Sequence, residues 1–89
     1  MGKVSCFDFE GVYCWFNSLE HRPPHFHAKR KGQWHVRVFF LNAEPNMIER
    51  AKGPAGRMSK NDRNALCEQA RLNREQLLGE WEEKVNCDA

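Results

Sequence analysis

Apolar and polar residues alternate through much of the first half of the chain. The stretch GVYCWFN (11–17) is rich in aromatic and β-branched residues and opens on a glycine, which predicts a strand. Residues 25–41, HFHAKRKGQWHVRVFFL, alternate, pause at Lys31 and Gly32, and alternate again, which predicts a β-hairpin. Residues 47–51 follow a turn and predict a weaker fourth strand.

The apolar period becomes helical after a predicted loop at 52–58. Ser59 is followed three residues later by Asp62, which resembles a capping box at the start of a helix. Asn73, followed by Gln76, indicates a second helix start. The apolar positions that predict the buried helix faces are Ala65, Leu66, Ala70, Leu77, Leu78, Trp81 and Val85.

Strands followed by helices predict an α+β fold. We expect a small antiparallel β-meander of three or four strands and then two C-terminal α-helices packed on one face. A chain of 89 residues has room for one hydrophobic core, so residues 1–89 are expected to form a single domain.

Composition narrows the class of protein. No apolar run approaches the roughly 20 residues that span a bilayer, and the start of the chain lacks the pattern of a signal peptide. Four cysteines without a C-x-x-C pair are expected to stay reduced in the cytoplasm. The net charge of +2 does not by itself indicate a nucleic-acid binder. The charges are nevertheless segregated, because 21–37 contains five Lys and Arg residues and no acid, whereas 75–83 is acidic.

Burial selects the register of the hairpin. A three-residue loop of Arg30, Lys31 and Gly32 puts glycine at a left-handed position. This loop pairs Ala28 with Trp34, and likewise Phe26 with Val36, so that apolar residues meet. A two-residue loop would instead put histidines on the apolar face.

The same register gathers histidines on the opposite face. It pairs His27 with His35 and His25 with Arg37, at distances where side chains touch. His21 precedes two prolines and is expected to fold back toward them.

Four roles for this cluster follow from its residue types. Neutral imidazoles are ligands for zinc, copper or nickel, which indicates a metal site of His21, His25 and His27. His25 and His27 with Arg37 would suffice for acid–base cleavage of RNA. Contact with an anion or an RNA backbone would use the set His25, His27, Arg30, His35 and Arg37. A purely structural role, in which the imidazoles cap carbonyls freed by the proline kink, is the fourth.

The segments EHRPPHFHA (20–28) and NREQLLGEWEE (73–83) together resemble a mainly bacterial family, domain of unknown function 4160. Members share an H-x-P-P-H-F-H segment and a final helix similar to R-E-x-L-L-x-x-W-E. The chain departs from the pattern at Lys29, where many members have an acid. The resemblance implies no established activity. It implies a gene on mobile genetic elements and a toxin–antitoxin-like pair.

We therefore predict a small cytosolic accessory protein that binds RNA or a small protein partner through its histidine and arginine residues. The alternatives are a metal-independent ribonuclease-like toxin and a metal-binding domain, so enzymatic activity stays open. No cofactor and no membrane contact are expected. Because aromatic residues occupy both faces of 13–16, we also expect a homodimer.

Overall fold

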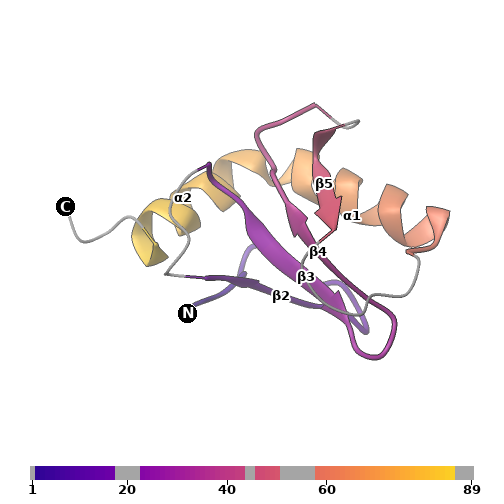
Figure 1. Cartoon of the computed structure of the whole chain (residues 1–89). Coiled ribbons are helices and arrows are strands. Elements are labelled where there is room, and N and C mark those ends of the chain that lie inside the picture. The colour runs from indigo at the N-terminus through magenta and orange to yellow at the C-terminus, as the bar shows by residue number, and fades with distance from the viewer. Residues whose placement is uncertain (1, 18–22, 44–45, 51–57, 86–89) are drawn as a thin grey trace.

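The computed structural model describes residues 2–17, 23–43, 46–50 and 58–85 (Figure 1). It has the predicted α+β architecture: five antiparallel strands form one sheet in chain order, and two helices follow. The elements are β1 (Gly2–Lys3), β2 (Tyr13–Phe16), β3 (Phe26–Arg30), β4 (Trp34–Val38), β5 (Ile48–Arg50), α1 (Lys60–Leu72) and α2 (Arg74–Lys84). The sheet is a plain meander in which every strand pairs with its neighbour in sequence.

The hairpin of β3 and β4 corrects the predicted register by two residues. Its loop has three residues, as expected, but these are Lys31, Gly32 and Gln33, and Arg30 pairs with Trp34. Gly32 has a φ of 76°, the left-handed conformation that glycine adopts without strain. His27 therefore lies opposite Arg37 rather than His35. A shift of two residues leaves every side chain on its predicted face.

The helix starts lie where the sequence indicated. The Ser59 hydroxyl accepts a hydrogen bond from the backbone N–H of Asp62 at 3.1 Å, which caps α1. Asn73 is the N-cap residue of α2, as predicted, but its side chain makes no capping hydrogen bond. The side chain of Asn73 instead donates to the carbonyl of Gln69 at 2.8 Å.

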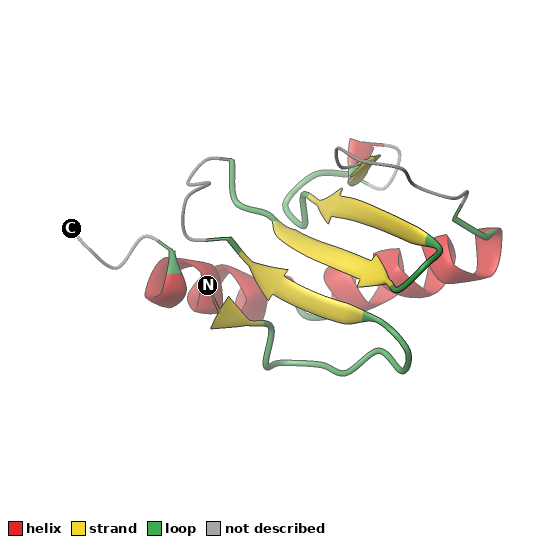
Figure 2. Cartoon of the chain, turned by 60° about the horizontal axis from the view of Figure 1, so that its bottom comes forward, coloured by secondary structure: helices red, strands yellow, loops and turns green. Residues whose placement is uncertain are grey.

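Both helices lie on one side of the sheet, as Figure 2 shows. The core fills the space between, and removal of this apolar surface from water is the main force that holds helices and sheet together. Ala65 is an exception to the predicted apolar stripe, since it is exposed while Cys67 is buried. The fully buried residues include Phe16, Phe26, Ala28, Val38, Phe40, Leu66, Ala70 and Leu77.

A network of polar contacts ties the N-terminal segment to α2. The carboxylate of Glu80 accepts hydrogen bonds from the backbone N–H groups of Ser5 and Cys6, at 2.7 and 2.8 Å. Lys84 donates to Glu80 at 2.8 Å and to the carbonyl of Lys3 at 2.7 Å. These contacts fix β1, a strand of two residues that sequence patterning did not predict.

In the part of the chain described, neither helix has the length and apolar content needed to cross a membrane.

Candidate functional site

One face of the sheet points away from both helices and carries the histidines. The pairings of β2 with β3 place Tyr13 opposite Lys29 and Trp15 opposite His27. Because side chains alternate along a strand, these residues share a face that is opposite to the core residues Cys14 and Ala28. We call this surface the histidine face; its residues are Tyr13, Trp15, His25, His27, Lys29, His35, Arg37, Phe39 and Glu49.

Five aromatic rings form an unbroken row across this face. Tyr13 stacks on Trp15 with ring centroids 5.2 Å apart, and Trp15 stacks on His27 at 5.1 Å. The row continues from His27 to His25 at 5.5 Å and from His25 to Phe39 at 4.9 Å. Three neighbouring strand regions therefore contribute to one aromatic surface.

The histidines are held in defined orientations. Nδ1 of His25 lies 2.7 Å from the carbonyl oxygen of Pro23. Since a carbonyl oxygen only accepts, this nitrogen carries the proton. Nδ1 of His27 lies 3.0 Å from Nε2 of His35, and the ring of His35 also lies 5.2 Å from that of Trp15. His25 and His27 are each only 6% exposed, so they connect the exposed rings of the row and offer little surface of their own.

The charges of the histidine face lie around the aromatic row. Lys29 is exposed beside Tyr13, its partner across the strands. Nη2 of Arg37 lies 2.9 Å from Oε1 of Glu49, and the Glu49 side chain is 58% exposed. The Nε atom of Arg37 is buried without a hydrogen-bond partner in the described part of the chain.

Arg30 is separated from the other predicted site residues. It lies on the helix side of the sheet, where Nε and Nη2 each donate to the carboxylate of Asp62 at 3.1 Å. Its guanidinium also lies 5.9 Å from the ring of Phe9 and 6.0 Å from that of Trp34. The structure thus gathers His25, His27, His35 and Arg37, while Arg30 joins the hairpin to α1.

The predicted metal ligands are only partly visible. His21 lies outside the described residues, so the structure places only His25 and His27 of the set of His21, His25 and His27. Among residues that the structure describes, no group of three His, Cys, Asp or Glu side chains is arranged to hold a metal ion.

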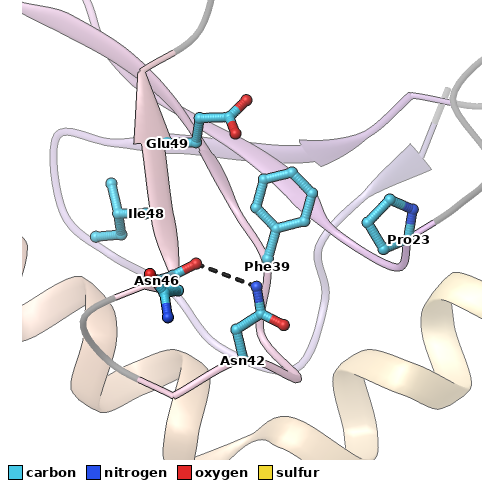
Figure 3. A pocket seen from close by; sticks show the side chains of 6 residues that line it. All are labelled: Pro23, Phe39, Asn42, Asn46, Ile48 and Glu49. Atoms are coloured by element: carbon cyan, nitrogen blue, oxygen red, sulfur yellow. Dashed lines mark hydrogen bonds between the residues drawn. The ribbon is translucent and has the colours of Figure 1, made fainter.

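A pocket opens beside the Phe39 end of the aromatic row (Figure 3). It is lined by Pro23, Phe39, Asn42, Asn46, Ile48 and Glu49 and has a volume of about 510 Å³. The side-chain amide of Asn42 donates to the backbone carbonyl of Asn46 at 3.1 Å. We call this the Phe39 pocket. The sequence pattern does not predict this pocket, although Phe39 and Glu49 do fall on the histidine face by strand alternation.

Comparison with known proteins adds one finding. A family model with the description Domain of unknown function (DUF4160) matches residues 11–82, which include the histidine face and most of both helices. Neither the curated proteins nor the solved structures gave a match.

Proposed function

The chain belongs to the family described as Domain of unknown function (DUF4160), and we propose that it is a binding module for single-stranded RNA. Its binding surface is the histidine face. The aromatic row is the observation that carries this proposal, because unstacked bases bind to aromatic rings on open sheet surfaces.

The exposed members of the row give the surface its capacity to bind bases. Tyr13 is 51% exposed, and Trp15 and Phe39 are partly exposed. Stacking of one base on an aromatic side chain contributes about 1–3 kcal/mol and tolerates any base. A strand of RNA that crosses the row would place successive bases over Tyr13 and Trp15 and then over Phe39.

The charges at the margins suit a phosphate backbone. Lys29 lies opposite Tyr13, and Arg37 lies in the adjacent strand. Each cation that neutralises a phosphate of single-stranded RNA steepens the salt dependence of log K by about 0.7. We therefore expect an affinity of modest salt dependence, supported mainly by stacking.

The burial of the histidines favours binding over cleavage. A general base must come within hydrogen-bond reach of the 2′-hydroxyl whose proton it removes. His25 and His27 are 6% exposed, and Nδ1 of His25 already donates to Pro23. A ribonuclease-like toxin with His25, His27 and Arg37 remains an alternative; cleavage of RNA in excess EDTA would support it.

The resemblance also predicts a small protein partner in a toxin–antitoxin-like pair. The exposed aromatic residues of the histidine face would suit a second copy of the chain as well. Sizing chromatography at several protein concentrations, with and without RNA, tests the homodimer. We also propose a cytosolic location, where the cysteines would stay reduced.

Fluorescence anisotropy with labelled single-stranded RNA tests the proposal. We expect Trp15→Ala to weaken binding by about 5-fold or more, which corresponds to about 1 kcal/mol of lost stacking. Lys29→Ala should reduce the salt slope by about 0.7. Lys60→Ala is its matched control, because it removes an exposed lysine from the start of α1, away from the histidine face.

Two outcomes would contradict the proposal. Wild-type protein that binds no RNA at low salt would exclude an RNA-binding function. An equal loss of affinity in Lys29→Ala and Lys60→Ala would show that binding follows net charge and does not use the histidine face.

A further inference from the structure

The Phe39 pocket offers hydrogen-bond acceptors to whatever enters it. The Asn42 amide nitrogen is engaged by the carbonyl of Asn46, which leaves the amide oxygen to accept. In Figure 3 this oxygen points toward the side of Pro23. The Glu49 carboxylate forms the opposite wall. Its Oε1 contacts Arg37; because each carboxylate oxygen has two lone pairs, both oxygens of this 58% exposed side chain can still accept.

The apolar part of the lining suits a flat ring. Phe39 lies between Pro23 and Ile48 in Figure 3, and all three present apolar surface to the pocket. A volume of about 510 Å³ lies within the range of small-ligand sites. His25 lies 4.9 Å from the Phe39 ring, so the pocket continues the aromatic row directly. A base at one end of the bound segment would enter the pocket beside Phe39.

Guanine is the RNA base whose edge matches this lining best, because cytosine offers a carboxylate one amino donor, N4, beside an acceptor, N3. The Watson–Crick edge of guanine carries two adjacent donors, N1–H and the N2 amino group, which a carboxylate accepts together. Adenine presents an acceptor, N1, at the equivalent position, where it would face the negative charge of Glu49. Uracil has a single donor between two carbonyl oxygens, which Glu49 and Asn42 would repel.

We infer that the Phe39 pocket binds a guanine base, with Glu49 accepting from its Watson–Crick edge and Phe39 stacking on its ring. Arg37 is a positioning residue, because its contact with Oε1 orients the Glu49 carboxylate. The inference deepens the proposed function and rests on it for the source of the base, which is a guanosine within single-stranded RNA. A free guanine nucleotide carries the same base, and the experiment distinguishes these two sources.

The test compares uridine-rich oligonucleotides that differ at one central position. We expect guanosine at that position to bind about 10-fold more tightly than adenosine or uridine, as for one good base-edge contact. Inosine, which lacks the N2 amino group, should lose most of this preference. Glu49→Gln should abolish the preference, while Glu68→Gln, an equal change of charge on the exposed side of α1, should keep it.

A second measurement follows the pocket directly. Titration of the ¹⁵N-labelled protein with guanosine monophosphate should shift the amide signals of Phe39, Asn42 and Glu49, and uridine monophosphate should not. Asn42→Ala should weaken these shifts.

The outcomes separate the two proposals. Equal affinity for the guanosine and adenosine oligonucleotides, with no guanosine-specific shifts, would overturn the pocket while the RNA-binding function stands. Guanosine monophosphate binding without RNA binding would support the pocket and reject the proposed function. Preference for an arginine-rich peptide over both nucleotide probes would assign the pocket to a protein side chain and overturn the inference.

Discussion

His27 and His35 are joined ring to ring across the hairpin, with Nδ1 of one 3.0 Å from Nε2 of the other. They come from diagonal positions of neighbouring strands, since His27 pairs with Arg37 and His35 pairs with Lys29. One of the two nitrogens must donate and the other accept, so the contact holds a single proton. This hydrogen bond fixes the His27 ring under Trp15, at the centre of the aromatic row.

The first prediction concerns this contact. His35→Ala should lower the free energy of unfolding by about 1–3 kcal/mol, because it removes a hydrogen-bond partner from a nearly buried imidazole. His35→Asn should lose less, since the amide can keep the contact. Urea denaturation measures both. A His35→Ala variant as stable as the wild type would show that water replaces the bond at no cost.

Asp62 joins α1 to the hairpin and is the subject of the second prediction. Its carboxylate accepts two hydrogen bonds from Arg30 and one from Nε1 of Trp34, all at 3.1 Å. The charged side chains are only 24% and 20% exposed. Asp62→Ala should therefore cost about 2–4 kcal/mol, as charge-assisted hydrogen bonds are lost and a partly buried guanidinium is left without its partner.

Thermal or urea unfolding checks this second prediction. The control is Glu68→Ala on the same helix, which removes an exposed carboxylate and should change the free energy by less than about 0.5 kcal/mol. Equal effects of the two substitutions would mean that the Arg30–Asp62 contact contributes nothing beyond helix charge.

Glu80 should make the stability depend on pH. Burial alone would raise the pKa of this carboxyl, but hydrogen bonds from Lys84, Ser5 and Cys6, with the charge of Lys84, lower it below its ordinary value of 4.5. The unfolded state then binds the proton more readily than the folded state. The contribution of Glu80 is therefore present above about pH 4.5 and is lost as the pH falls through the lower, folded pKa.

The measurement for Glu80 is urea denaturation at a series of pH values from about 6 down to about 3. Glu80→Gln should flatten the decline in stability over that window relative to the wild type. Glu82→Gln, which changes an exposed carboxylate of the same helix, should leave the decline unchanged. A wild-type profile with no slope below pH 4.5 would contradict the prediction.

The fourth prediction concerns the reactivity of two thiols. Burial raises the pKa of Cys6 to about 12, and the hydrogen bond and charge of Glu80 add to the rise. Burial also raises the pKa of Cys14 to about 12, with smaller effects of Asp8 and Cys6. Since the thiolate is the nucleophile, both cysteines should be alkylated slowly at neutral pH.

Removal of the Glu80 charge should separate the two cysteines. Glu80→Gln should speed alkylation of Cys6 by up to about 10-fold for each unit by which its pKa falls, and Cys14 should stay slow. Mass spectrometry of peptides after timed iodoacetamide treatment reads each site. Parallel acceleration of both sites would indicate local unfolding instead of an electrostatic effect.

The alternation of apolar and polar residues, together with the helix-capping residues, predicted much of this fold. Strand side chains repeat every two residues, so the histidines of the hairpin were assigned correctly to the face opposite Phe26 and Val38. Ser59 marked the start of α1 because a hydroxyl at that position satisfies a free backbone N–H within the same turn. Both signals depend only on residues close together in the chain.

Contacts between distant residues decided the rest. Arg30 remains in β3, the loop lies at Lys31–Gln33, and the guanidinium is bound by Asp62, 32 positions away, a contact that local periodicity cannot predict. The same contact took Arg30 out of the predicted binding set. The Phe39 pocket likewise combines Pro23 with residues of the β4–β5 turn and of β5 itself. Local periodicity assigns a side chain to a face; its partners there depend on how the whole chain packs.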